Sequence, residues 1–163
     1  IGNLLAYIVQ DYVGYIEKEN QNVKLFYNFK QDINDPLPID ADEDRITQVI
    51  SNLLNNAIKF TSKKREGIIS VSAERKKEEV IVSIKDTGEG INPEILPRLF
   101  TKFVTRSFSG TGLGLYISKS IVEAHGGKMW AENNPDGEGA TFTFTLPLSS
   151  SRKTIMFSRK DGR

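Results

Sequence analysis

The stretch Ile46 to Thr61 reads I-T-Q-V-I-S-N-L-L-N-N-A-I-K-F-T and decides the fold. At about 100° per residue, helical spacing places its apolar side chains on one continuous arc. This arc contains Val49, Phe60, Leu53, Ile46, Ala57, Ile50 and Leu54. The pattern predicts an amphipathic helix with a buried face. Asp40, followed three residues later by Glu43, predicts a capping box at its start.

Three polar residues of this stretch, Asn52, Asn56 and Lys59, fall on a separate arc. Asparagine is a mediocre helix former, so helix propensity does not explain two of them at this spacing. An amide oxygen is a neutral ligand that suits Mg²⁺, and an ammonium group attracts phosphate. For this segment alone, a solvated polar face remains the simpler interpretation.

The composition excludes several classes of function. The chain has 163 residues, a formal net charge of +1, no cysteine and one histidine, His125. Near-neutral charge argues against a nucleic-acid partner, and the lack of cysteine rules out disulfides and thiolate metal sites. A single histidine supports neither a histidine metal cluster nor a Ser-His-Asp triad.

The length fits one domain, which we expect to span residues 1–148, followed by a basic and flexible tail at 149–163. No apolar run is long enough to cross a membrane, and no signal-peptide pattern begins the chain. We therefore expect a cytoplasmic domain that makes no membrane contact, although its parent protein could be membrane-anchored. Because the chain starts at Ile1, we also expect a fragment of a longer protein.

Apolar periodicity predicts alternating helices and strands along the rest of the chain. A first helix is expected from about Asn3 to Asn20, and a last helix from the Gly110–Leu115 turn to about Ala124, ended by Gly126 and Gly127. One or two short helices are expected within Pro93–Phe103, where Phe100 and Phe103 are spaced to share a face. Strands are expected at Val23–Phe29, Ile68–Arg75, Val80–Lys85, Lys128–Glu132 and Thr141–Leu146, the second and third forming a hairpin.

Two glycine-rich stretches suggest ligand contacts. G-T-G-L-G-L, Gly110 to Leu115, enters a helix, where backbone N–H groups can bind phosphate. It lacks the lysine of a P-loop and the third glycine position of the dinucleotide fingerprint. D-T-G-E-G-I, Asp86 to Ile91, places a carboxylate at a strand end beside glycines that would admit a flat ring. Taken singly, the first stretch is a weak signal, because glycine-rich turns are common, and an ordinary turn is the preferred interpretation of the second.

Together, the ordered motifs resemble the catalytic ATP-binding domain of sensor histidine kinases, in the superfamily shared with gyrase-type and heat-shock chaperone ATPases. The resemblance covers about Asn3 to Leu148. Its carriers are N-L-L-N-N-A-I-K-F-T (N box), D-T-G-E-G-I (G1 box), L-F-T-K-F (F box), G-T-G-L-G-L (G2 box), the helix exit I-V-E-A-H-G-G-K-M-W and the closing strand G-A-T-F-T-F-T-L-P.

The resemblance implies a two-layer α/β sandwich of the Bergerat type: a mixed, mainly antiparallel sheet with helices on one face and an ATP lid. It implies ATP and Mg²⁺ as cofactors, Asn56 as the metal ligand, and Asn56 with Lys59 as the catalytic residues. Asp86 would select adenine through its amino group, and Thr141 would contact it through water. The implied ATP-binding set is Asn52, Asn56, Lys59, Phe60, Asp86, Gly88, Gly90, Ile91, Phe103, Gly110, Thr111, Gly112, Leu113, Gly114, Leu115 and Thr141.

The implied function is that of a protein-histidine kinase catalytic domain, which donates the γ-phosphate of ATP to a histidine on a separate dimerisation domain. A response-regulator receiver domain would be the further partner. His125 matches a family position that is not the phosphoacceptor, and whether Lys102 or Arg106 contacts the γ-phosphate stays open. Two alternatives also stay open: an ATP-hydrolysing relative, disfavoured because Asn52 stands where its general base would be, and a non-enzymatic nucleotide sensor.

Overall fold

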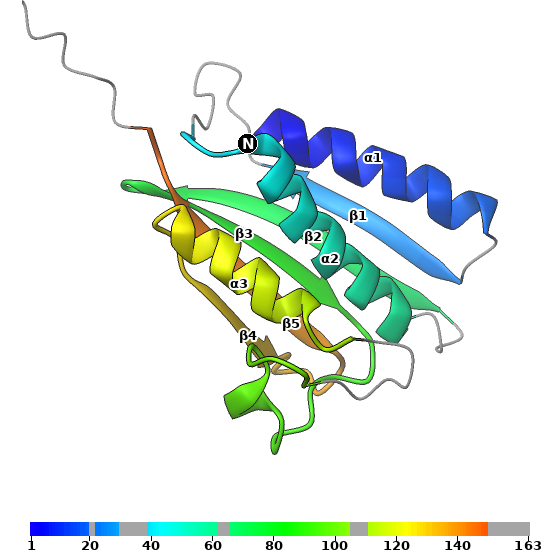
Figure 1. Cartoon of the computed structure of the whole chain (residues 1–163). Helices are drawn as coiled ribbons and strands as arrows, with labels where there is room; N and C mark the ends of the chain where they lie inside the picture. Colours follow the sequence, from blue (N-terminus) through cyan, green and yellow to red (C-terminus); the bar gives the residue numbers. More distant parts are fainter. Residues whose placement is uncertain (20–21, 30–38, 62–65, 105–110, 150–163) are drawn as a thin grey trace, which may run out of the picture.

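The computed structural model describes residues 1–19, 22–29, 39–61, 66–104 and 111–149. These residues form an α/β fold, as predicted (Figure 1). In chain order the elements are α1 (Gly2–Lys18), β1 (Val23–Phe29), α2 (Glu43–Thr61), β2 (Gly67–Lys76), β3 (Glu79–Asp86), the 3-10 turn η1 (Leu96–Arg98), α3 (Gly114–Ala124), β4 (Met129–Asn133) and β5 (Ala140–Pro147).

The five strands form one sheet in the order β1-β2-β3-β5-β4. Strands β1 and β2 are parallel, and the other neighbours are antiparallel, which confirms a mixed, mainly antiparallel sheet. The predicted hairpin is β2–β3, in which Lys76 pairs with Glu79 and leaves a two-residue turn. The register at its other end pairs Ile69 with Asp86, so β3 delivers Asp86 to the end of the sheet.

The three α-helices lie on the same face of the sheet (Figure 1), with α2 in contact with both α1 and α3. The core lies between the two layers. The predicted apolar arc of α2 is buried except for Phe60, which is only half-buried. In β3 and β5 every second residue faces this core, as Val80, Val82 and Ile84 do in β3. This alternation decides below which strand residues can reach the site.

The start of α2 differs from the prediction. The backbone N–H of Arg45 donates to Asp42 Oδ1 at 3.1 Å, and that of Ile46 donates to the Asp42 carbonyl at 3.0 Å. Asp42 is therefore the N-cap, and the expected capping box of Asp40 with Glu43 is wrong by two residues. The cause lies upstream, because Ile39 forms an antiparallel bridge with Leu148 that keeps the chain extended.

The segment between Asn92 and Val104 contains only η1 as regular structure, which fits the predicted short helix. Phe100 packs against the core, but Phe103 is 73% exposed, so the expectation that they share a face is wrong. Phe103 has a φ of +66°, which turns the chain out of any helix that could align the two rings. The tail beyond Ser149 lies outside the described residues, so its role stays a prediction.

Candidate functional site

A cavity of about 230 Å³ lies where α2, the end of β3, the Asn92–Val104 segment and the start of α3 meet. It brings together predicted site residues from three segments that are distant in sequence: α2, Asp86–Ile91 and Thr111–Leu115. Those that line it are Asn52, Asn56, Lys59, Phe60, Asp86, Gly90, Ile91, Thr111, Gly112, Gly114 and Leu115. The structure therefore places most of the predicted set around one cavity.

The α2 wall presents Asn52, Asn56 and Lys59 on successive turns. Asn52 Nδ2 donates to the Ser118 hydroxyl on α3 at 2.9 Å. A Cβ at Gly114 would meet the side-chain amide of Asn52, so a larger residue there would force that amide to move. Asn52 therefore joins α2 to α3, while Asn56, one turn later, faces the cavity.

Asp86 supplies a buried carboxylate to the cavity. Strand alternation puts it on the same face as Ile84, toward the helices, and its side chain is only 3% exposed. Its Oδ1 accepts the backbone N–H of Gly88 at 2.8 Å and that of Ala140 at 3.4 Å. These two donors hold the carboxylate in one orientation. Gly88 does not line the cavity, but it orients the residue that does.

The start of α3 forms the remaining wall. Leu113, the residue before the helix, makes no side-chain cap bond to the first turn of α3. Gly112 has a φ of +66°, and its carbonyl accepts the N–H of Phe103 at 3.0 Å. A glycine-rich turn before an uncapped helix N-terminus is suited to binding an anion. Leu113 and Phe103 lie outside the lining, and Gly110 lies outside the described residues.

The part of the chain that forms this site matches a known protein family. The family described as histidine kinase-, DNA gyrase B- and HSP90-like ATPase matches residues 41–150. The chain belongs to this ATPase family. Because this is a family of ATPases, ATP is the nucleotide that family membership indicates for this chain.

Two curated relatives of this ATPase domain are a sensor protein and a sensor histidine kinase. The sensor protein FixL of Bradyrhizobium diazoefficiens is 40% identical over 138 residues, which cover 84% of this chain and 26% of FixL. The sensor histidine kinase ZraS of Escherichia coli is 44% identical over 121 residues, covering 74% of this chain and 25% of ZraS. The chain thus spans about a quarter of the length of these relatives.

Solved structures agree with the fold. The catalytic domain of the histidine kinase ThkA is similar with a TM-score of 0.77 at 33% identity, covering 91% of this chain and 92% of that one. ThkA in complex with the response regulator TrrA is similar with a TM-score of 0.74 at 31% identity, covering 91% of this chain and 40% of that one.

The ATPase domain also contains site residues that the sequence patterns did not single out. Apart from the amide of Asn92, those that line the cavity are apolar: Ile95, Leu99, Val104, Ala140 and Phe142. The four-residue spacing of Ile95 and Leu99 was a usable signal, because it places both on one side of a short helical segment. The alternation of β5 was another, because it directs Ala140 and Phe142 toward the helices.

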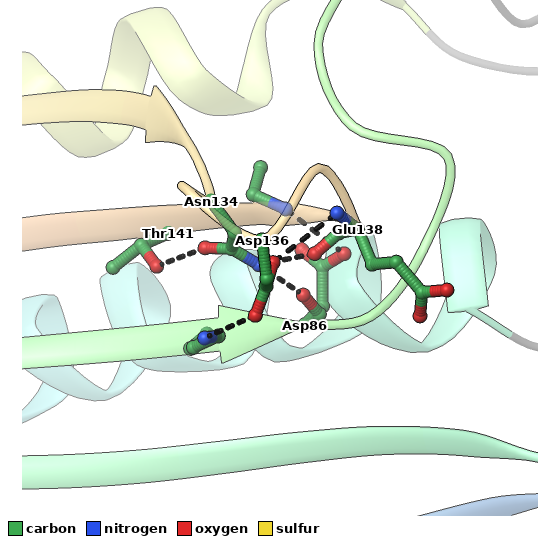
Figure 2. A network of polar contacts seen from close by, with 7 residues as sticks. Asp86, Asn134, Asp136, Glu138 and Thr141 are labelled. Carbon is green, nitrogen blue, oxygen red and sulfur yellow. Dashed lines mark hydrogen bonds and ion pairs between the residues drawn. The ribbon is translucent and has the colours of Figure 1, made fainter.

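Thr141, by contrast, falls on the other face of β5, where it pairs with Lys85. Its hydroxyl donates to Asn134 Oδ1 at 2.6 Å, and it does not line the cavity (Figure 2). The placement gives no support to the expected contact between Thr141 and a base, because alternation turns the side chain away from the core. Asn134, which no sequence motif points to, is 4% exposed and lies at the centre of this polar network.

The described residues contain neither a candidate membrane helix nor an acidic metal cluster. None of the described helices is both long and apolar enough to cross a membrane. Within the same described ranges, no cluster of three or more His, Cys, Asp or Glu side chains could hold a metal ion.

Proposed function

We propose that this chain is the ATP- and Mg²⁺-binding catalytic domain of a two-component sensor histidine kinase. It would donate the γ-phosphate of ATP to a histidine on a separate dimerisation domain. The observation that carries the proposal is the convergence of Asn56, Lys59, Asp86 and the start of α3 on one cavity. The sensor-kinase relatives support this function over the alternative of a gyrase-like or chaperone-like ATPase. The reaction would place the domain in the cytoplasm, where ATP is available.

In this proposal, different residues contact different parts of the nucleotide. Asp86, buried and oriented by two backbone donors, would accept a hydrogen bond from the amino group of adenine. The uncapped N-terminus of α3 would bind phosphate oxygens through backbone N–H groups. The ammonium group of Lys59 would offset phosphate charge. Catalysis by this domain would consist of positioning and charge neutralisation, as is usual for phosphoryl transfer.

The donor set fits Mg²⁺ bound largely through the nucleotide. The described part of the chain contains no acidic or histidine cluster, so it does not provide a metal site made only of such protein ligands. Mg²⁺ in nucleotide sites commonly keeps several waters and takes few protein ligands besides the phosphates. Asn56, which lines the cavity, would supply one neutral oxygen, and the bound ion would neutralise charge on the transferred phosphoryl group.

His125 has a structural role that removes it as a phosphate acceptor. Its Nε2 accepts the backbone N–H of Asp42 at 3.1 Å, so its other nitrogen, Nδ1, carries the proton and donates to the Ile121 carbonyl at 2.8 Å. It lies at the C-terminal end of α3, an 11-residue helix. At ~1.5 Å per residue the two ends of α3 are ~16 Å apart. In this proposal the acceptor histidine would therefore come from the separate dimerisation domain.

Phosphotransfer from γ-labelled ATP tests the proposal. The isolated chain should bind ATP and remain essentially unlabelled, because no imidazole lies in line with the γ-phosphate. Addition of a cognate dimerisation and acceptor-histidine domain should produce an acid-labile label on that partner, which a response-regulator receiver domain then removes. Efficient labelling of His125, or multiple-turnover hydrolysis by the isolated chain, would contradict the proposal.

A further inference from the structure

The loop between Asp86 and Ile91 is held at both ends by two consecutive asparagines from another part of the chain. Asn133 ends β4, and Asn134 begins the turn that leads to β5. Asn134 Nδ2 donates to the backbone carbonyl of Asp86 at 2.7 Å. Asn133 holds the other end, because it bonds to the backbone of Ile91. The β4–β5 turn therefore acts as a template for this loop.

Asn134 is buried, and both ends of its amide are used. Besides the Asp86 carbonyl, Nδ2 reaches the Glu138 carbonyl at 2.5 Å, and Oδ1 accepts the Thr141 hydroxyl at 2.6 Å (Figure 2). These contacts fix the turn from Asn134 to Gly139. The turn in turn presents the N–H of Ala140 to Asp86 Oδ1. Asn134 thus positions the Asp86 carboxylate in two ways. It bonds directly to the backbone carbonyl of Asp86, and it fixes the turn whose Ala140 N–H donates to the carboxylate.

The packing between turn and loop is close as well as polar. A Cβ at Gly139 would collide with the carbonyl of Asp86 and approach the N–H of Gly88. Gly139 also has a φ of +75°, which favours glycine. The turn therefore packs directly on the backbone of Asp86 and Gly88, and only glycine fits at their point of contact.

Asn133 makes a two-point contact. Its Oδ1 accepts the N–H of Ile91 at 2.7 Å, and its Nδ2 donates to the carbonyl of Ile91 at 2.8 Å. A side-chain amide bonded to both backbone groups of one residue imitates the neighbouring strand that Ile91 lacks. Ile91 lines the cavity, so this pair sets where the apolar wall lies relative to the carboxylate of Asp86.

We propose that Asn133 and Asn134 are positioning residues that set base selection by fixing Asp86 and Ile91 relative to each other. Neither lines the cavity, so both act through the residues that do. The proposal rests on the proposed function, in which Asp86 accepts from the amino group of adenine. A carboxylate that is free to turn would tolerate the carbonyl of guanine more readily, so loosening the clamp should narrow the preference for ATP over GTP.

Binding titrations of ATP and GTP to three variants test this. Asn134→Asp keeps the size and one acceptor but removes both donated bonds. Asn133→Ala removes the Ile91 contact at an exposed position, where folding should be retained. Asp136→Asn is the matched control, because it makes a similar exchange in the same turn without contacting the Asp86–Ile91 loop.

We expect Asn133→Ala to lower the ATP-to-GTP affinity ratio by about two- to tenfold, the effect of one net hydrogen bond, and Asn134→Asp to lower it at least as much. Asp136→Asn should leave the ratio unchanged. The ATP-to-GTP affinity ratio separates a positioning role from loss of stability, because a smaller folded fraction lowers the apparent affinity for both nucleotides by the same factor.

The possible outcomes are distinct. If the unmutated chain binds ATP selectively and Asn133→Ala leaves the ratio unchanged, the inference is wrong and the proposed function stands. The inference is equally wrong if Asp136→Asn lowers the ratio as much as the two clamp variants. If Asn134→Asp does not fold, Asn133→Ala alone decides. If the unmutated chain binds neither nucleotide, the proposed function itself fails.

Discussion

The two ends of the cavity are built in opposite ways. At the end of the sheet, Asp86, Asn134 and Ala140 are each no more than 4% exposed, and the Asp86 and Asn134 side chains are hydrogen-bonded. Across the cavity, the Asn92–Val104 segment has no buried residue and only one 3-10 turn. Figure 1 shows this green segment extending beyond the end of the sheet.

The Asn92–Val104 segment contacts α3 through two cation–π pairs. Lys102 lies 4.9 Å from the ring centre of Tyr116, and Lys119 lies 5.4 Å from that of Phe100. Such exposed cation–π contacts contribute about 0.5–1 kcal/mol each, whereas an unpaired buried polar group costs about 1–3 kcal/mol. The difference suggests that the sheet end recognises the base in a fixed geometry, and that the opposite wall adapts to the nucleotide.

The largest effect should come from the fixed end. Asp86→Asn keeps an oxygen for the N–H groups of Gly88 and Ala140, but the new amide can turn a donor toward the amino group of adenine. ATP affinity should fall on the order of a hundredfold, and the preference for ATP over GTP should shrink. Isothermal titration with both nucleotides measures this. Equal affinity of the unmutated chain for ATP and GTP would show that Asp86 does not recognise the base.

A somewhat smaller loss is expected on the α2 wall. Asn56→Ala removes the oxygen proposed for Mg²⁺, which should cost roughly 1.5–3 kcal/mol, or about tenfold to a hundredfold in Mg²⁺-dependent ATP affinity. The difference between variant and unmutated chain should largely disappear in EDTA. Asn55→Ala is a suitable control, because it removes an exposed neighbour from the same helix turn. Unchanged ATP binding by Asn56→Ala in Mg²⁺ would rule out the ligand assignment.

The contrast between the two ends also explains what the sequence could predict. Regular periodicity was sufficient for α2 and for the β2–β3 hairpin, because burial repeats at a fixed spacing in both. It was also sufficient to place Asp86, since the alternation of β3 continues to its last residue. The family motifs added the glycine turn before α3, which no periodicity defines.

The features that the sequence did not predict depend on contacts between residues that are far apart in the chain. Asn134 bonds to the Asp86 carbonyl across 48 residues of sequence, and Asn133 bonds to Ile91 across 42, so neither pairing has a local pattern. The misplaced cap of α2 has the same origin, because the bridge from Ile39 to Leu148 delays the helix. Thr141 was assigned by resemblance, whereas strand alternation could have predicted that its side chain points away from the core.

Hydrogen exchange compares the two ends directly. Without nucleotide, the amides of Ile95 to Val104 should exchange faster than those of Gly88 and Ala140, because exposed short-range backbone bonds open at low cost. ATP should slow exchange in Ile95–Val104 and change little at the sheet end. Lys102→Met should speed exchange in that segment modestly, by removing its contact with Tyr116. Strong protection of the segment in the free protein, unchanged by ATP, would contradict an adaptable wall.

The smallest effect should be electrostatic, at the exposed rim of the fixed end. The backbone N–H of Glu138, followed by the ammonium of Lys85, lowers the pKa of Asp136 below its ordinary value of 3.8. Because the folded-state pKa is the lower one, ionised Asp136 stabilises the fold above pH 3.8, and this contribution is lost as the pH falls through the folded-state pKa.

An NMR titration of the Asp136 carboxyl group should therefore show a midpoint below 3.8. Lys85→Met should raise that midpoint only partly, since the larger cause is the backbone donor in the turn. Added salt should weaken the Lys85 contribution and leave the backbone contribution in place. A midpoint that returns fully to the ordinary value in Lys85→Met would mean that the turn does not hold Asp136, and would weaken the case that the β4–β5 turn is the rigid part of the site.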